Sequence, residues 1–333
     1  TARLLETGAK VGADSWQARV KNQTPHCKFG EEGICCRICT MGPCRITKKA
    51  PRGICGCDVH GIVGRNYLKF TAGGASAHSD HGREICHTLY ETAADGCYKV
   101  KDPEKLIRIA KEWGMETEGK DIYELAHEVA LEGLMEYGKP FGTQRFLKRA
   151  PESQQKLWEE NELAPYAIDR EVSRSLHMTH MGCSSKPEAL VKQAIRCGLG
   201  DGWGGSMMGT EFSDILFGTP KPIETEANLG VMVEENVNIV VHGHDPSLSE
   251  MICEVADSPE MIAYAKEQGA KGITISGVCC TSNEVAMRRG IPMAGNFLQQ
   301  ENVVLTGACE AIVVDVQCIF PALGPLSKCF HTK

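Results

Sequence analysis

The sequence places seven of its 17 cysteines in a single stretch, residues 27–57. They follow the order C-x7-CC-x2-C-x4-C-x10-C-x-C and are set among glycines and prolines. Thiolates at this density favour a segment that wraps around a metal cluster rather than one that pairs into strands. The N-terminal part of the chain is therefore constrained to form a metal-binding segment. Its cysteines are Cys27, Cys35, Cys36, Cys39, Cys44, Cys55 and Cys57.

The adjacent pair Cys35–Cys36 indicates two sites rather than one. Neighbouring side chains on an extended backbone point to opposite sides, so these two thiols are poorly placed to bind the same small cluster. Four thiolates then make one complete set for an iron–sulfur cubane, and two are left as half of a second set. A two-fold dimer would supply the other half from a second chain. The complete set is Cys36, Cys39, Cys44 and Cys55, the half set is Cys27 and Cys35, and Cys57 has no role.

Two other uses of the cysteines have to be weighed. Four thiolates also suit a structural zinc site, and C-x2-C occurs at both kinds of site, so zinc stays open on this segment alone. Disulfides are disfavoured, because 17 cysteines in 333 residues fall below the density of a short disulfide scaffold and no signal peptide is recognisable. So many reduced thiols favour the cytoplasm of a cell that keeps oxygen low.

Composition sets the outer limits of what the chain can be. With 42% hydrophobic residues, 333 residues are enough to bury one large core or two smaller ones. No apolar run approaches the roughly 18 residues of a membrane span, so we expect no transmembrane segment. The formal charge of -7 argues against nucleic acid as a partner.

The spacing of apolar residues changes once along the chain. From about residue 58 to residue 217 they recur every three or four positions, which predicts helices, with starts at Asp121 and Pro187. After residues 217–230, short β-branched runs alternate with helical pattern, which predicts a parallel sheet. We therefore predict an α/β protein in two domains. The first, residues 1–225, is all-helical and carries the cluster segment, and the second, residues 226–333, is Rossmann-like and incomplete at its C-terminus.

Three strand-like runs, residues 237–244, 272–280 and 311–318, each end in a potential metal ligand. His244 ends the first, Cys279 and Cys280 end the second, and Cys318 ends the third. The carboxyl ends of parallel strands meet at one edge of a sheet, so these side chains should converge in one crevice. A single cysteine at a strand end is usually a core thiol, but three strand ends together favour a second metal centre. Imidazole with thiolates suits iron or nickel in a sulfide-bearing cluster as well as zinc.

A third group of polar residues recurs every three positions, at His78, His81, Glu84 and His87. On a helix each step shifts the side chain by about 60° relative to the last, so the residues form a strip that winds round the helix. Successive groups on such a strip lie close enough to pass protons. The simpler alternative is a polar helix face with scattered histidines.

Across essentially its whole length the chain resembles the N-terminal half of an anaerobic nickel–iron carbon monoxide dehydrogenase. The resemblance is carried by GICCRICTMGPCRI, GGASAHSDH, ILFGTPKPIETEANLGV, VVHGHDP, GVCCTSNEVAMRRGIP and DVQCIFP. It implies a homodimer whose chains each have an N-terminal helical domain followed by Rossmann-like domains. It also implies oxidation of carbon monoxide with water to carbon dioxide, which is reversible and yields two electrons and two protons.

The resemblance assigns roles residue by residue. Cys27 and Cys35 match the ligands of a [4Fe-4S] cluster shared between two chains, and Cys36, Cys39, Cys44 and Cys55 match those of an internal cluster. His244, Cys280 and Cys318 match ligands of the nickel–iron–sulfur active-site cluster. Among catalytic groups, His78 matches the general base near the substrate, His81 and His87 a proton exit route, and Asp201 a supporting carboxylate. Glu84 stands where that route often has another histidine.

The resemblance also implies partners and leaves alternatives. A ferredoxin or similar carrier would take the electrons, and an acetyl-CoA synthase is a further candidate partner. The family's remaining active-site cysteines and a lysine belong to a C-terminal half that this sequence does not contain, so we expect a truncated copy or a second polypeptide. Alternatives are a hybrid-cluster-protein-like reductase, whose cysteine spacing lacks the adjacent pair followed by GPCRI, and a truncated, non-catalytic electron-transfer protein.

Overall fold

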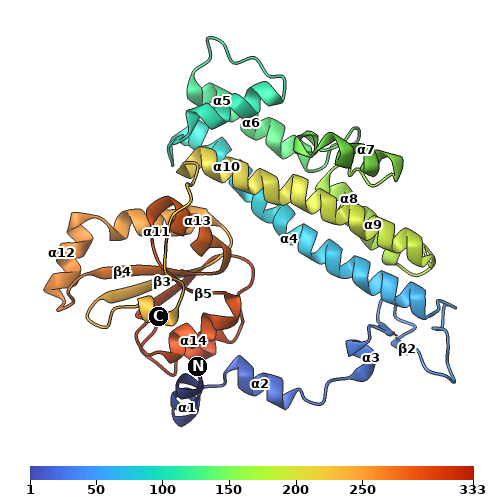
Figure 1. The fold of residues 1–333 in the computed structure, drawn as a ribbon, viewed down its shortest axis with the longest axis horizontal. Coiled ribbons are helices and arrows are strands. Elements are labelled where there is room, and N and C mark those ends of the chain that lie inside the picture. The colour runs from blue at the N-terminus through green and yellow to red at the C-terminus, as the bar shows by residue number, and fades with distance from the viewer. The chain divides into compact units, whose positions relative to one another are not determined.

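The computed structural model describes all residues, 1–333, and divides them into two compact units (Figure 1). The α/β unit joins Thr1–Thr24 to Phe217–Lys333, and the helical unit is Pro25–Leu216. This division differs from the predicted boundary, because residues 1–24 belong with the C-terminal part. The physical reason is packing: Leu4 and Leu5 lie against a buried cluster that contains Leu305. No helix in either unit has the length and apolar character needed to cross a membrane.

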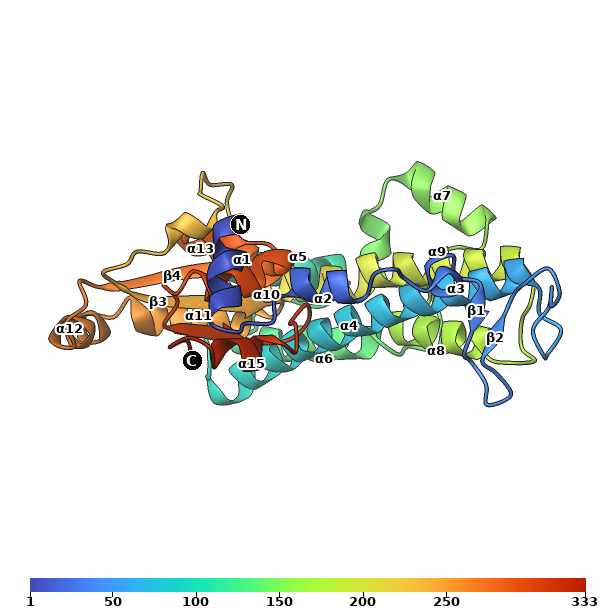
Figure 2. The same cartoon turned by 90° about the horizontal axis from the view of Figure 1, so that it is seen from below.

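The helical unit is built around α4 (Val59–Asp95), a helix of 37 residues. Asp58 caps its N-terminus by accepting a hydrogen bond from the N–H of Gly61. Helices α6, α8 and α9 pack along α4 (Figure 1, Figure 2). The predicted helix starts at Asp121 and Pro187 are confirmed as the N-cap of α6 and the first residue of α9. The other elements of this unit are α3 (Lys28–Glu31), β1 (Cys35–Cys36), β2 (Cys44–Arg45), α5 (Pro103–Glu112), α6 (Ile122–Glu136), η1 (Arg145–Arg149), α7 (Glu152–Glu160), α8 (Ile168–Thr179), α9 (Pro187–Gly200), η2 (Asp201–Ser206) and α10 (Met207–Phe217).

A glycine lets η2 approach α4 closely. A Cβ added at Gly82 would lie 2.5 Å from the carbonyl oxygen of Gly205 and 2.4 Å from the hydroxyl of Tyr137. Any side chain there would push the two backbones apart. η2 is a π-helical turn, a rare conformation that is often found at functional sites.

The α/β unit contains a four-stranded parallel sheet with the order β5-β4-β3-β6. The three predicted runs are β3, β4 and β6, which confirms a helix-rich α/β fold with a parallel sheet. β5 was not predicted, because its three residues, Met-Ala-Gly, include no β-branched side chain. The elements are α1 (Ala2–Lys10), α2 (Trp16–Asn22), η3 (Leu229–Val231), β3 (Val237–Gly243), α11 (Pro246–Ala256), α12 (Pro259–Glu267), β4 (Ile273–Val278), α13 (Cys279–Arg289), β5 (Met293–Gly295), η4 (Phe297–Gln299), α14 (Gln300–Leu305), β6 (Ala311–Val314) and α15 (Leu323–Ser327).

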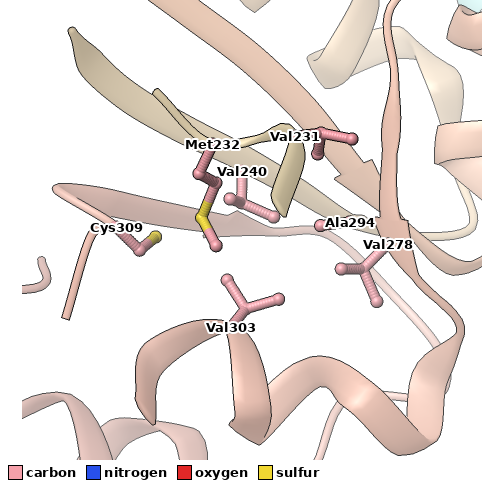
Figure 3. Close-up of a cluster of buried hydrophobic side chains, with 7 residues drawn as sticks. All are labelled: Val231, Met232, Val240, Val278, Ala294, Val303 and Cys309. Atoms are coloured by element: carbon pink, nitrogen blue, oxygen red, sulfur yellow. The ribbon is translucent and has the colours of Figure 1, made fainter. Parts of the chain in front are cut away.

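Both faces of the sheet are covered by apolar side chains. Val240 points to one face, where it packs with Val303 of α14 in the cluster drawn in Figure 3. Its neighbour Val241 points to the other face and packs with Cys253 of α11 and Val285 of α13. Burial on both faces is the usual condition of a parallel sheet and leaves the strand ends as the accessible edge.

Candidate metal centres

Four of the predicted cluster ligands line one pocket in the helical unit. β1 and β2 pair antiparallel and place Cys36 opposite Cys44, so the expectation that this segment would not pair into strands was wrong. Each strand is only two residues long, which still allows the segment to turn around the pocket. Cys36 and Cys44 line the pocket together with Cys39 and Cys55. Cys35 is not among the lining residues. The adjacent thiols of Cys35 and Cys36 therefore face different surroundings, as expected of neighbours on an extended backbone.

The lining of this pocket fits a cubane. All 17 cysteines are free thiols, and the backbone N–H of Ile54 donates a hydrogen bond to Cys44 Sγ at 3.4 Å. Gly53 leaves room beside that sulfur, since a Cβ there would lie 3.5 Å from it. No three His, Cys, Asp or Glu side chains converge on a position for a single metal ion. In a cubane each of four thiolates binds a different iron, so the four thiols that line this pocket supply the number a cubane needs.

The pocket contains a fifth cysteine. Cys57 is buried and lines the same wall, although no role was predicted for it. Burial raises the pKa of the Cys57 thiol. The pKa of Cys55 is lowered, first by a hydrogen bond from the backbone at Cys57 and also by the guanidinium of Arg65. The Cys55 thiol thus ionises more readily than the Cys57 thiol, which agrees with the prediction that Cys55, and not Cys57, is a cluster ligand.

The half set of ligands lies outside this pocket. Cys27 is exposed and precedes α3 as its N-cap residue. Cys35 is partly buried, and its carbonyl accepts a hydrogen bond of 2.9 Å from Asn66 Nδ2 of α4. Both thiols remain predicted ligands of a shared cluster.

In the α/β unit the predicted ligands follow neighbouring strands. β3 lies between β4 and β6, and the chain crosses from one side of β3 to the other after β5. This crossing makes the boundary between β3 and β6 a topological switch point, and open parallel sheets bind their ligands at the carboxyl ends of the strands there. His244 follows β3, Cys280 lies at the start of α13 directly after β4, and Cys318 follows β6.

The three thiols at these strand ends lie together. Cys279 Sγ is 3.8 Å from Cys280 Sγ. Burial, and then the neighbouring Cys279, raise the pKa of the Cys318 thiol. The hydrogen bond with Cys280 raises the pKa of Cys279, and the same contact lowers the pKa of Cys280. A proton shared by the pair therefore resides on Cys279 and leaves Cys280 as the better thiolate. Soft thiolates grouped in this way suit part of a metal–sulfur centre.

Two residues that the sequence analysis missed hold the ligand-bearing turns. Asp315 Oδ1 accepts hydrogen bonds from the backbone N–H groups of His244 at 2.6 Å and Asp245 at 3.2 Å. Gln300 is fully buried and donates to the carbonyl of Cys318 at 2.9 Å. Asp315 stands in the DVQC motif, but no spacing rule would have singled out Gln300 in the helix that follows β5. Their function depends on which strands become neighbours.

Gln300 also connects the Cys318 turn to the centre of the sheet. Its Oε1 accepts from the N–H of Phe320 at 2.7 Å and lies 3.1 Å from Nε2 of His242 in β3. Burial lowers the pKa of His242, so this imidazole is held neutral. The turn after β6 is thus tied to β3 by buried polar contacts.

In the helical unit, His78 and Asp201 form a hydrogen-bonded pair. His78 Nδ1 lies 2.7 Å from Asp201 Oδ1, and Asp201 is the first residue of the π-helical turn η2. The hydrogen bond to Asp201 raises the pKa of His78, because the carboxylate stabilises the imidazolium. The two residues were predicted from separate motifs, and the structure brings them together.

The remaining members of the histidine strip differ in exposure. His81 is buried on α4, and a Cβ at Gly209 of α10 would lie 3.0 Å from its ring. Glu84 and His87 are exposed. The strip therefore runs from the interior of the unit to its surface, and its use as a proton route stays a prediction.

The sequence matches the model of the Prismane/CO dehydrogenase family over residues 34–333. The chain belongs to this family. Among curated members of the Prismane/CO dehydrogenase family, it is 47% identical to carbon monoxide dehydrogenase 1 of Methanosarcina mazei over 99% of this chain and 54% of that protein. It is 46% identical to carbon monoxide dehydrogenase 1 of Carboxydothermus hydrogenoformans over 99% of this chain and 53% of that protein. The predicted resemblance is confirmed.

Solved structures of the family share the fold. The nickel-free carbon monoxide dehydrogenase of Thermococcus sp. AM4 superposes with a TM-score of 0.96 at 49% identity, covering 100% of this chain and 54% of that one. An acetyl-CoA synthase/carbon monoxide dehydrogenase described with NiZn[Fe4S4] and NiNi[Fe4S4] clusters in its alpha subunits gives 0.94 at 42% identity, covering 99% and 50%. The chain spans about half the length of the family members it matches.

Proposed function

We propose that this chain supplies the N-terminal half of a carbon monoxide dehydrogenase, which oxidises carbon monoxide with water to carbon dioxide, reversibly, and releases two electrons and two protons. The carrying observation is the grouping of four free thiols around one pocket, in a chain 47% identical to a carbon monoxide dehydrogenase. The thiols at the strand ends and His244 would provide part of the active-site ligand set. The rest would come from residues beyond this chain.

The chain's own residues would hold the metals and move protons. His244, Cys280 and Cys318 would hold a nickel–iron–sulfur cluster, which when bound would supply a site for carbon monoxide and acidify a water molecule. With Nδ1 of His78 facing Asp201, Nε2 is the atom that accepts the proton from water. His81 and then His87 would pass protons toward the surface.

Electrons would leave through the thiolate-bound cubanes. The pocket lined by Cys36 and its three partners would hold one cubane per chain, and Cys27 with Cys35 would hold half of a shared one. An exposed apolar strip on α4, formed by Val63, Tyr67 and Phe70 at 40%, 54% and 82% exposure, favours contact with a second copy of the chain. A ferredoxin-type carrier would receive the electrons, and an acetyl-CoA synthase is a candidate partner, since one relative is the beta subunit of such a complex in Moorella thermoacetica.

Iron content tests the cluster assignment. In protein purified without oxygen, Cys36→Ser should remove about four irons per chain, because the internal cubane belongs to one chain. Cys35→Ser should remove about two, because a shared cubane counts half for each chain. Cys97→Ser is the matched control, since Cys97 is an exposed thiol of the same unit and does not line the pocket of Cys36. Equal losses for Cys35→Ser and Cys97→Ser would contradict the shared cluster.

Nickel content and dye reduction test the activity. Bound nickel, together with carbon monoxide-dependent reduction of a viologen dye, would support the dehydrogenase. Cubane iron without nickel and without that reduction would leave the electron-transfer alternative. Zinc in place of iron would contradict both. The hybrid-cluster-type alternative is disfavoured by relatives that are named carbon monoxide dehydrogenase at 40–48% identity.

A further inference from the structure

A buried cation lies in the wall of the internal-cluster pocket, which is the pocket lined by Cys36, Cys39, Cys44 and Cys55. Arg65 of α4 is 3% exposed and lines this pocket. A buried charge needs a compensating partner, and for arginine this is commonly a carboxylate. Arg65 instead donates its Nε–H to the carbonyl of Ser184 at 2.8 Å, and its guanidinium contributes to lowering the pKa of the Cys55 thiol on the pocket wall. Its positive charge is therefore directed at the thiolates of the pocket.

The loop at residues 181–185, between α8 and α9, fixes the guanidinium. Nη2 of Arg65 donates to the same Ser184 carbonyl, so the planar group is held at two points. The loop packs directly on the first turn of α4, because a Cβ at Gly61 would lie 2.9 Å from the carbonyl oxygen of Ser185. Met181 of the same loop also lines the pocket. The cation thus has a fixed position relative to the four thiols.

A fixed cation matters because a cubane changes its charge when it accepts an electron. With four thiolates the cluster is an anion in both states, and the reduced state carries one more negative charge. A positive charge in a site of low dielectric constant stabilises the more negative state. Hydrogen bonds to the sulfurs act in the same direction, and both effects are established determinants of cluster potential.

We propose that Arg65 raises the reduction potential of the internal cubane and that the loop at residues 181–185 serves to hold its guanidinium there. This rests on the proposed function, because the cation can tune only a cluster that is present. As a consequence, the internal cubane accepts electrons more readily from the other clusters of the protein. Arg65 would contribute no ligand and touch no substrate.

Three variants test the proposal in the chain with its cubane in place. Arg65→Gln removes the charge, and Arg65→Lys keeps it. Arg37→Gln is the control, since Arg37 follows the ligand Cys36 directly, is exposed, and loses the same charge where water screens it. The measurement is a reductive titration under argon, followed by the electron paramagnetic resonance signal of the reduced cubane.

We expect Arg65→Gln to shift the one-electron equilibrium at least tenfold toward the oxidised cluster, a potential lower by about 59 mV. Arg65→Lys and Arg37→Gln should each shift it less than threefold. Equal potentials for Arg65→Gln and Arg37→Gln would overturn the proposal. So would an Arg65→Lys potential as low as that of Arg65→Gln, because charge would then not be the cause.

Two further outcomes concern whether the cubane is retained. A wild-type chain that takes up no cubane would contradict the proposed function and not this inference about Arg65. If Arg65→Gln fails to retain the cubane, Arg65→Lys carries the test: a retained cluster at an unshifted potential supports the charge, and a tenfold shift overturns it.

Discussion

Gln300 provides the sharpest test of how the candidate active-site edge is held together. Its side chain is fully buried and makes hydrogen bonds to the turn that carries Cys318, to Phe320 and to His242. Gln300→Leu keeps the size and burial of the side chain but removes every one of these contacts. We expect it to loosen the Cys318 turn before it affects the remainder of the sheet.

The magnitude follows from the groups that lose a partner. Within the turn, the N–H of Phe320 and the carbonyl of Cys318 would each be left without Gln300, at about 1–3 kcal/mol for a buried group. Phe320 is only partly buried and Cys318 lies in an exposed turn, so water can replace part of the loss. We therefore expect about 2–3 kcal/mol, which corresponds to a roughly 30- to 140-fold change in the local opening equilibrium.

Gln300→Glu adds a pH signature. The introduced carboxyl keeps the acceptor for Phe320 but turns a second oxygen toward the carbonyls of Phe297 and Cys318. Ionisation is disfavoured there, so the folded-state pKa of this carboxyl lies above its unfolded value of about 4.3. Relative to the wild type, stability is lost as pH rises from the unfolded value to the folded one, and it recovers as pH falls.

Hydrogen exchange followed by mass spectrometry is the appropriate assay, because it reports the two units of the chain separately. Peptides covering residues 315–320 should exchange faster in Gln300→Leu by the stated factor. Gln268→Leu is the control, because Gln268 is exposed at the end of α12 in the same unit. If the two variants change the exchange rates equally, or if Gln300→Leu changes them by less than about fivefold, Gln300 does not hold the Cys318 turn.

Three further predictions concern other positions. Asp201→Asn should lower the pKa of His78 in an NMR titration. Because the folded-state pKa of His78 is raised, its contact with Asp201 stabilises the fold below about pH 6.5, and this stabilisation disappears as pH rises through the folded-state pKa. The variant should lack this pH-dependent stabilisation. Gly82→Ala should lower the free energy of unfolding by about 1–3 kcal/mol through overlap with neighbouring atoms, and Tm by about 2–4 °C per kcal/mol. Gly73→Ala should not destabilise the same helix, because no atom lies within 4 Å of the added Cβ. Asp315→Ala should speed amide exchange in the turn after β3. Asp315→Asn keeps the accepting oxygen, so it should change the free energy of local opening by at most half as much. Equal effects of the two variants would show that the lost acceptor is not the cause.

Local patterns were sufficient to predict the long helices and three of the parallel strands, but not the short strands β1 and β2 of the cysteine segment. Apolar spacing located α6 and α9, whose starts at Asp121 and Pro187 follow from side-chain capping and from the fixed φ of proline. β-branched runs located β3, β4 and β6. Because parallel strands end at one edge, the same pattern predicted that the ligands after those strands would be neighbours, and the thiols of Cys280 and Cys318 do share the partner Cys279.

Contacts between distant segments could not be predicted in this way. Trp16 donates its ring N–H to the carbonyl of Leu298 at 2.7 Å, which helps to place residues 1–24 in the α/β unit. The local sequence around Trp16 gives no indication that Leu298 is its partner. Arg65 is one arginine on a long helix, and its burial depends on a loop more than 100 residues later. Gln300 acquires three of its four contacts, those to His242, Cys318 and Phe320, only when the sheet has formed. Such residues depend on topology and not on local spacing.

The two adjacent cysteine pairs show why the same dipeptide can serve different ends. Cys35–Cys36 lies in a short strand, so its side chains diverge and only Cys36 reaches the cluster pocket. Cys279–Cys280 lies where β4 turns into α13, and Cys279 has a φ of +70°, in the left-handed region that cysteine rarely adopts. That turn removes the strand alternation and brings both sulfurs to within 3.8 Å of each other.

Cys318 has a φ of +58°, so two of the three thiols at this edge sit on strained backbone. Each such residue costs of order 1–3 kcal/mol and persists only where surrounding contacts enforce it. For Cys318 these contacts include the hydrogen bond from Gln300 to its carbonyl. Divergent thiols suit two separate clusters, whereas thiols forced together suit one centre. Backbone conformation, and not the cysteine pair itself, therefore determines how many metal sites the pair can serve.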